Sequence, residues 1–92
     1  MADAPLKVSA KSNPNAVAGA LAAALRERDS AELQAVGAGA INQAVKAVAI
    51  ARTYLHASEL DAVCLPAFIT VEIGEVERTG ISLVVERRTS RA

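Results

Sequence analysis

The feature that most constrains the fold is the stretch 34–55, QAVGAGAINQAVKAVAIARTYL, in which a short strand-like run passes through two glycines into a long alanine- and valine-rich segment. From about residue 40 to residue 57 this segment reads as a helix that is apolar over most of its circumference. Gly37 and Gly39 lie in the turn before it, where glycine permits positive φ angles and a close approach of the backbone. A buried helix directly after a strand favours an α/β fold, with the rest of the chain covering this unit.

Outside that helix, the sequence indicates one further helix and four strands. Residues 6–10, LKVSA, alternate apolar and polar side chains as a half-buried strand does. Asn13 is a good helix N-cap, and Pro14 fits the first helical position, so a helix should begin near residue 14. Further strands are expected at 32–36, 60–73 and 81–85, with a polar turn at 74–80.

The resulting order, β-α-β-α-β-β, predicts an α/β two-layer sandwich: a four-stranded mixed sheet with two helices on one face. The first two strands should run parallel, because a helix connects them, and the last two antiparallel. Pro66 removes one ladder donor, so the third strand should be kinked, bulged or at an edge there.

Length and composition indicate a single domain, residues 1–92, with one modest core at about 6–87. A domain this small, with so apolar a second helix, predicts a homodimer or a higher homo-oligomer through that helix. The one cysteine allows no internal disulfide, and neither a signal peptide nor a membrane-length apolar run is present. We therefore expect a soluble cytoplasmic protein without a membrane partner.

The charges cancel overall but are unevenly placed. Residues 58–77 hold five acidic side chains and no basic one, whereas residues 78–92 hold four arginines and one glutamate. Strong DNA binding driven by counterion release would normally need a clear basic excess, which is missing. One Phe and one Tyr also leave little surface on which bases could stack. A local basic patch remains compatible with this composition.

Polar residues follow the first strand and open the second helix. The two groups are Lys11, Ser12 and Asn13, then Asn42, Gln43 and Lys46. Because the carboxyl ends of parallel strands meet at one edge of a sheet, both groups should lie together there. Two cations and several amides suit phosphate oxygens or another polar ligand. The alternative is that Asn13 only caps its helix and the others are solvated.

The other candidate binding or catalytic residues have simpler structural interpretations. The Gly37–Gly39 turn resembles a phosphate-binding loop, but Asn42 stands where a third glycine would be needed, so no nucleotide cofactor is predicted. His56 near a helix end is more typical of a surface residue, and Cys64 in an apolar strand of a core residue. Three acids, Glu72, Glu75 and Glu77, could suggest metal ligands but read better as a soluble edge. We expect no catalytic residues, no metal and no cofactor.

Three stretches of the sequence resemble a known protein family. LKVSAKSNPNAVAGALAAALRER, LQAVGAGAINQAVKAVAIAR and ERTGISLVVE, with PAF before the last, resemble the stage V sporulation protein S family over about residues 6–87. The VSAKS-PN and GAGA-NQAVKA segments are the most specific. The resemblance implies a small bacterial regulator of progress through sporulation, with relatives in bacteria that form no spores and no established catalytic activity.

That family in turn resembles the Alba group of chromatin and RNA-binding proteins. The resemblance implies an Alba-like fold with the same β-α-β-α-β-β order, a dimer, and nucleic-acid binding through three features: the loop after the first strand, the start of the second helix and an extended hairpin. In this chain Lys11 falls in the loop, Lys46 slightly further along the second helix and Arg78 in the hairpin, with Arg87 and Arg88 as peripheral candidates.

The chain departs from the Alba pattern in charge. Asn42 and Gln43 are neutral where Alba-type chains are basic, and the hairpin is acidic apart from Arg78. We therefore expect a regulator that is not an enzyme and binds DNA or RNA weakly. Two alternatives stay open: a protein-interaction adaptor that binds no nucleic acid, and an enzyme or small-ligand sensor that uses residues 37–43.

Overall fold

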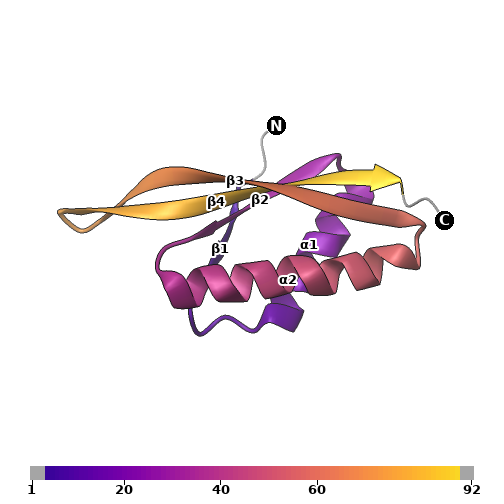
Figure 1. Ribbon diagram of the computed structural model, residues 1–92, viewed down its shortest axis with the longest axis horizontal. Coiled ribbons are helices and arrows are strands. Elements are labelled where there is room, and N and C mark those ends of the chain that lie inside the picture. Colours follow the sequence, from indigo (N-terminus) through magenta and orange to yellow (C-terminus); the bar gives the residue numbers. More distant parts are fainter. Residues whose placement is uncertain (1–3, 90–92) are drawn as a thin grey trace.

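Six elements follow one another along residues 4–89, which are the part of the chain that the structure describes. They are β1 (Leu6–Val8), α1 (Pro14–Glu27), β2 (Ser30–Ala35), α2 (Ala38–His56), β3 (Leu60–Ile73) and β4 (Val76–Thr89). Figure 1 shows this computed structural model with the sheet as one layer and both helices beneath it as the other. The predicted β-α-β-α-β-β order and two-layer α/β fold are confirmed.

The four strands form one mixed sheet in the order β1-β2-β4-β3. β1 runs parallel to β2, with Val8 opposite Ala35, and β4 runs antiparallel to both of its neighbours. β1 and β3 are therefore the outer strands. Pairing of β3 with β4 continues without a break through Pro66, which lies opposite Leu83. Of the three expected explanations for this proline, the edge position is the one observed.

The hairpin differs from the sequence prediction. The expected turn at 74–80 is only Gly74 and Glu75, because β4 already begins at Val76. Gly74 has a φ of +64°, which glycine adopts without strain. β2 pairs with β4 only as far as Ile81, so residues 69–80 form a two-stranded ribbon beyond the sheet. We call this ribbon, which projects to the left in Figure 1, the hairpin arm.

The polar side chains of the arm account for this difference. Residues 76–79 are all exposed, so this part of β4 needs no apolar alternation, and its polar residues look like a turn. The core lies instead between the sheet and the helices. Leu33, Leu83 and Val85 supply its sheet side and Leu21, Leu25 and Leu55 much of its helix side.

The apolar surface of α2 is covered mainly within the chain itself. Its buried residues are largely alanines, including Ala44, Ala47 and Ala51, which let the helix pack closely against α1 and the sheet. Of its larger apolar side chains, Val45 is the most exposed, at 53%. Self-association through α2 stays a prediction, but most exposed large apolar side chains lie elsewhere, on β3 and the hairpin arm.

Candidate nucleic-acid interface

The loop after β1 and the first two turns of α2 lie against each other. The Gln43 side chain donates from Nε2 to the carbonyl oxygen of Ser12 at 2.9 Å. A Cβ added to Gly39 would lie 2.9 Å from the Cβ of Ala10, so the loop packs onto the helix where only glycine fits. The expectation that these two distant segments meet at one edge of the sheet is confirmed. We call residues 9–13 and 38–46 together the rim.

Hydrogen bonds within the loop fix its shape. The Ser12 amide donates to the Ser9 carbonyl oxygen at 3.0 Å, and the Ser9 amide donates to Ser12 Oγ at 2.8 Å. The Lys11 amide donates to Ser9 Oγ at 3.2 Å. Sequence reasoning did not select Ser9, although two serines three residues apart are a recognisable turn pattern. The turn holds the backbone of Lys11 while its side chain is exposed.

Asn13 has the capping role that the sequence predicted. Its Oδ1 accepts hydrogen bonds from the amides of Asn15, at 2.8 Å, and Ala16, at 3.4 Å. Pro14 occupies the first helical position of α1. The side-chain oxygen of Asn13 thus accepts its hydrogen bonds from α1. Only its side-chain nitrogen is left to donate to a ligand.

The start of α2 presents polar side chains beside this loop. Gly37 is the N-cap with a φ of +93°, and no side chain caps the helix. Asn42 and Lys46 are one turn apart on α2, so they share a face, and both are exposed. Gln43 is half-buried because it holds the loop. The positive end of the helix dipole lies at the same place.

The hairpin arm is anchored next to the rim. A Cβ on Gly80 would lie 2.8 Å from the carbonyl oxygen of Ala35 and 2.9 Å from Val36 Cγ2, so the base of the arm packs on the end of β2. A shallow cavity of about 280 Å³ lies between the arm and β1 and β2, with Lys7 and Glu72 among its lining residues. Arg78 is exposed on this arm, opposite Val71.

The charge of the arm is unfavourable for a polyanion. Glu72 lies directly opposite Glu77 across the ribbon, and Glu75 occupies the turn between them. All three are exposed. Arg78 is the one cation among residues 69–80. The arm therefore adds one positive and three negative charges beside the rim.

The two peripheral arginines lie at the other end of the sheet. Arg87 donates to the carbonyl oxygens of Leu25, at 3.0 Å, and Arg26, at 3.3 Å, and to Asp29 Oδ1 at 2.7 Å. It thus fastens the C-terminal end of α1 to β4, and its place among nucleic-acid contacts stays a prediction. Arg88 is exposed near the end of β4, opposite Asp61 and away from the rim.

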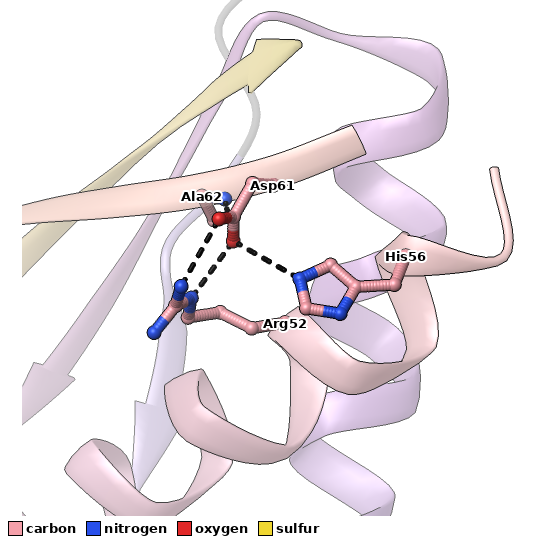
Figure 2. Close-up of polar contacts among 4 residues, drawn as sticks. All are labelled: Arg52, His56, Asp61 and Ala62. Carbon is pink, nitrogen blue, oxygen red and sulfur yellow. Dashed lines mark hydrogen bonds and ion pairs between the residues drawn. The ribbon is translucent and has the colours of Figure 1, made fainter. Parts of the chain in front are cut away.

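A second ionic cluster joins the end of α2 to the start of β3 (Figure 2). Arg52 makes a two-pronged contact with Asp61, at 2.7 Å from Nε and 3.0 Å from Nη2. The amide of Ala62 donates to the same carboxylate at 2.8 Å, and His56 Nε2 lies 3.8 Å from it. The hydrogen bond from Arg52 is the main cause that lowers the pKa of Asp61 to about 2. His56 is exposed in the last turn of α2, as expected for a surface residue.

A third polar cluster lies on the sheet itself. Glu32 Oε2 accepts hydrogen bonds from Ser82 Oγ at 2.6 Å and from Gln34 Nε2 at 3.1 Å. These bonds, the one from Ser82 foremost, lower the pKa of Glu32. Cys64, by contrast, is half-buried and packs against the core. Residues 4–89 contain no group of three or more His, Cys, Asp or Glu side chains placed to hold a metal ion.

These elements define a small two-layer α/β protein whose polar residues gather on a rim built from two distant segments. A family model described as Stage V sporulation protein S (SpoVS) matches residues 4–88. The chain therefore belongs to the SpoVS family of sporulation proteins, which is not known as an enzyme family. Within residues 4–89, no helix has the length and apolarity needed to cross a membrane.

Proposed function

We propose that this chain is a cytoplasmic regulator of the sporulation type that acts without catalysis, by binding DNA or RNA through the rim. The observation that supports this most is the bond from Gln43 to Ser12, which joins the loop after β1 to the head of α2. Lys11, Asn42 and Lys46 are exposed around that junction. The bond joins the loop that carries Lys11 to the helical turns that carry Asn42 and Lys46.

The proposed contacts are to the phosphate and sugar backbone. The ammonium groups of Lys11 and Lys46 attract phosphate oxygens, and the amide nitrogens of Asn13 and Asn42 can donate to phosphate or base edges. Ser12 and Gln43 hold the loop in place by hydrogen bonds and add polar atoms at the centre of this surface. Because the loop is already fixed by its own hydrogen bonds, little conformational entropy is lost on binding. The contacts involve no covalent step.

The same surface predicts weak binding. Two lysines supply few counterion-releasing contacts, and the acidic hairpin arm with Glu72, Glu75 and Glu77 repels a polyanion. Arg78 offsets one of those charges. We expect an affinity that falls with salt along a shallow slope, and little discrimination between sequences, since backbone contacts carry no sequence information.

Fluorescence anisotropy with labelled single-stranded DNA, duplex DNA and RNA, each at several salt concentrations, tests the proposal. Lys11→Ala and Lys46→Ala should each lower the affinity for every sequence and reduce the salt slope by about one. Arg88→Ala removes the same charge at the opposite end of the sheet and should leave the slope unchanged. A double variant, Lys11→Ala with Lys46→Ala, that binds with the wild-type slope would contradict the proposal.

A protein-interaction adaptor is the second candidate, and the acidic arm is the observation that favours it. Glu72 opposite Glu77 is a repulsive pair in the isolated chain, which a basic partner protein would relieve. Glu72→Gln with Glu77→Gln separates the two functions. If the rim binds nucleic acid, neutralising the arm should strengthen that binding. If the chain is an adaptor, the variant should lose a partner whose capture persists after nuclease treatment.

A further inference from the structure

A second cavity lies at the end of the sheet away from the hairpin arm. Its volume is about 470 Å³, which is within the usual range for a ligand site. The cavity lies between the segment that begins β1, the C-terminal half of α1 and the first residues of β2. Leu6, Ala20, Ala24, Glu32 and Val84 are on its walls. No residue of the rim lines it, so the two sites are separate.

The floor of this cavity is the backbone edge of β2. Leu33 is buried in the core, so its neighbour Glu32 points to the face of the sheet turned away from the helices. Val84 lies opposite Glu32 on β4 and points the same way. Ala20 and Ala24, in contrast, belong to the helical layer. Because side chains from both layers line one cavity, the edge of β2 must lie between them.

That edge is open at its first residues. β1 pairs with β2 only from Leu33 onward, so among residues 4–89 no strand lies beside residues 30–32 on that side. The Arg87 amide donates to the carbonyl oxygen of Asp29 at 2.8 Å, which directs Asp29 toward β4. Successive residues of a strand direct their backbone groups to opposite edges, so the N–H and C=O of Ser30 point to the open side. Such an edge can accept an added strand.

Glu32 gives the cavity a fixed negative charge. Its Oε2 accepts hydrogen bonds from two neutral donors, Ser82 and Gln34, which lower the pKa of this half-buried side chain and keep it ionised at neutral pH. Within residues 4–89, its Oε1 accepts no hydrogen bond and no basic side chain lies within ion-pair distance. Arg28 and Asp29, also on the walls, bring one charge of each sign. The cavity is therefore suited to a cation at Glu32.

We propose that the open edge of β2 binds an extended segment of a partner protein as an added strand, in which one lysine or arginine stands between two apolar residues. The side chains of a strand point alternately to the two faces of a sheet. The basic side chain would reach Glu32 on one face, and its two neighbours would lie over Ala20 and Ala24 on the other. Backbone hydrogen bonds supply affinity in this mode of recognition, and the alternate side chains supply specificity.

The other occupants match fewer features of the site. A small cation would use Glu32 but leave the backbone edge and the alanines uncovered. A nucleic acid would bring its phosphates toward an ionised carboxylate. The site lies at the N-terminal end of β2, whereas the rim and the hairpin arm lie at the C-terminal end (Figure 1). The inference therefore does not rest on nucleic-acid binding, and it can be measured on the free chain.

An NMR titration of the full ¹⁵N-labelled chain with a capped synthetic peptide, Gly-Ser-Val-Lys-Val-Ser-Gly, tests the proposal. The amides of Ser30, Ala31 and Glu32 should shift together in one saturable process, while those of Lys11 and Asn42 stay in place. The matched control is the same peptide with glutamate in place of lysine. It should bind at least about tenfold more weakly, because it places a like charge beside Glu32.

Two pairs of variants examine the two walls separately. Glu32→Gln keeps an acceptor oxygen for Ser82 but removes the charge, and should weaken binding of the lysine peptide about tenfold. Glu77→Gln makes the same change on the hairpin arm and should leave this binding unchanged. Ala20→Arg fills the cavity with a cation of the chain itself and should abolish binding. Ala23→Arg, also exposed on α1 but outside the cavity, should not.

Four results would overturn the proposal. The first is a lysine peptide that causes no saturable shift at residues 30–32, and the second is a glutamate peptide that binds as tightly as the lysine peptide. Equal shifts with lysine amide alone would assign the site to a small cation. Shifts at residues 30–32 that grow with protein concentration in the absence of peptide would assign the edge to a second copy of the chain.

Discussion

The two ends of the helical layer use cations in opposite ways. At the end formed by the C-termini of α1 and α2, Arg26 donates to the carbonyl oxygen of Tyr54, Arg87 to that of Leu25, and Arg52 to Asp61. At the rim, no ion pair among residues 4–89 involves Lys11 or Lys46. Guanidinium groups thus hold elements together at one end, whereas ammonium groups face solvent at the other.

This contrast shows which cations are available for binding. Arginine suits the fixed end because its planar fork can satisfy two carbonyl or carboxylate oxygens at once. Lysine on a mobile stem suits a surface that meets phosphates in variable positions. The composition, with equal numbers of acidic and basic side chains, does not show which cations hold the fold together and which face solvent. Each prediction below alters one of these two ends.

Removing Arg87 should have the largest effect on stability. Arg87→Met keeps the aliphatic stem but leaves the carbonyl oxygens of Leu25 and Arg26, and the Asp29 carboxylate, without their donor. Because hydrogen bonds to charged groups contribute about 1.5–3 kcal/mol, we expect a loss of about 2–3 kcal/mol in the free energy of unfolding. Urea unfolding followed by circular dichroism measures it, and a loss below about 0.5 kcal/mol would contradict a structural role.

Crowding the rim should have a smaller effect on stability but a direct one on binding. In Gly39→Ala the new methyl group would meet Ala10 Cβ at 2.9 Å and push the loop off α2. We expect a loss of about 1–2 kcal/mol together with weaker nucleic-acid binding. Gly19→Ala is the matched control, because nothing lies within 4 Å of its added Cβ. Wild-type binding by Gly39→Ala would show that the rim geometry is irrelevant.

The ionic cluster at the fixed end predicts an acid-sensitive contribution to stability. The pKa of Asp61 lies at about 2 in the folded chain, below its ordinary value of 3.8. Because the pKa of Asp61 is lower in the folded than in the unfolded chain, the ionised carboxylate stabilises the folded state when the pH is above about 4. This contribution is lost as the pH falls from about 4 to about 2. Asp61→Asn should flatten that part of the stability profile, measured by urea unfolding. An unchanged profile would show that Arg52 does not hold the carboxylate in solution.

The rim lysines should matter least for folding. Lys46→Ala should change the free energy of unfolding by no more than about 0.5 kcal/mol, because an exposed side chain without an ion pair contributes little. Its effect should appear in the salt dependence of nucleic-acid binding. A strongly destabilised Lys46→Ala would place this residue with the fixed end and contradict the comparison.

Much of the fold could be predicted because local signals and tertiary structure agree. Asn13 and Pro14 mark the start of α1, and the alternating residues of β1 mark a half-buried strand. The parallel pairing of β1 with β2 then brings the rim together without further information. The length of the hairpin arm was not predictable in this way, because residues 76–79 are exposed and no buried face imposes a pattern on them.

The site itself could be predicted only in outline. Lys11, Asn42 and Lys46 follow from their positions after strands, but the bond from Gln43 to Ser12 depends on the exact seating of the loop. The structural role of Arg87 depends on contacts with residues some sixty positions earlier, for which the sequence carries no local signal. The same holds for the exposure of Phe68, which is 81% exposed although it lies in an apolar stretch of β3.

The most direct test of the central claim, that the loop after β1 and the start of α2 form one nucleic-acid interface, is an NMR titration of the ¹⁵N-labelled chain with a short oligonucleotide. We predict that the amides of Lys11, Ser12, Asn42 and Gln43 shift together in one saturable process, while those of Arg52 and Asp61 stay in place. Shifts confined to the end with Arg52 and Asp61, or rim amides that do not move at saturating oligonucleotide, would contradict the account.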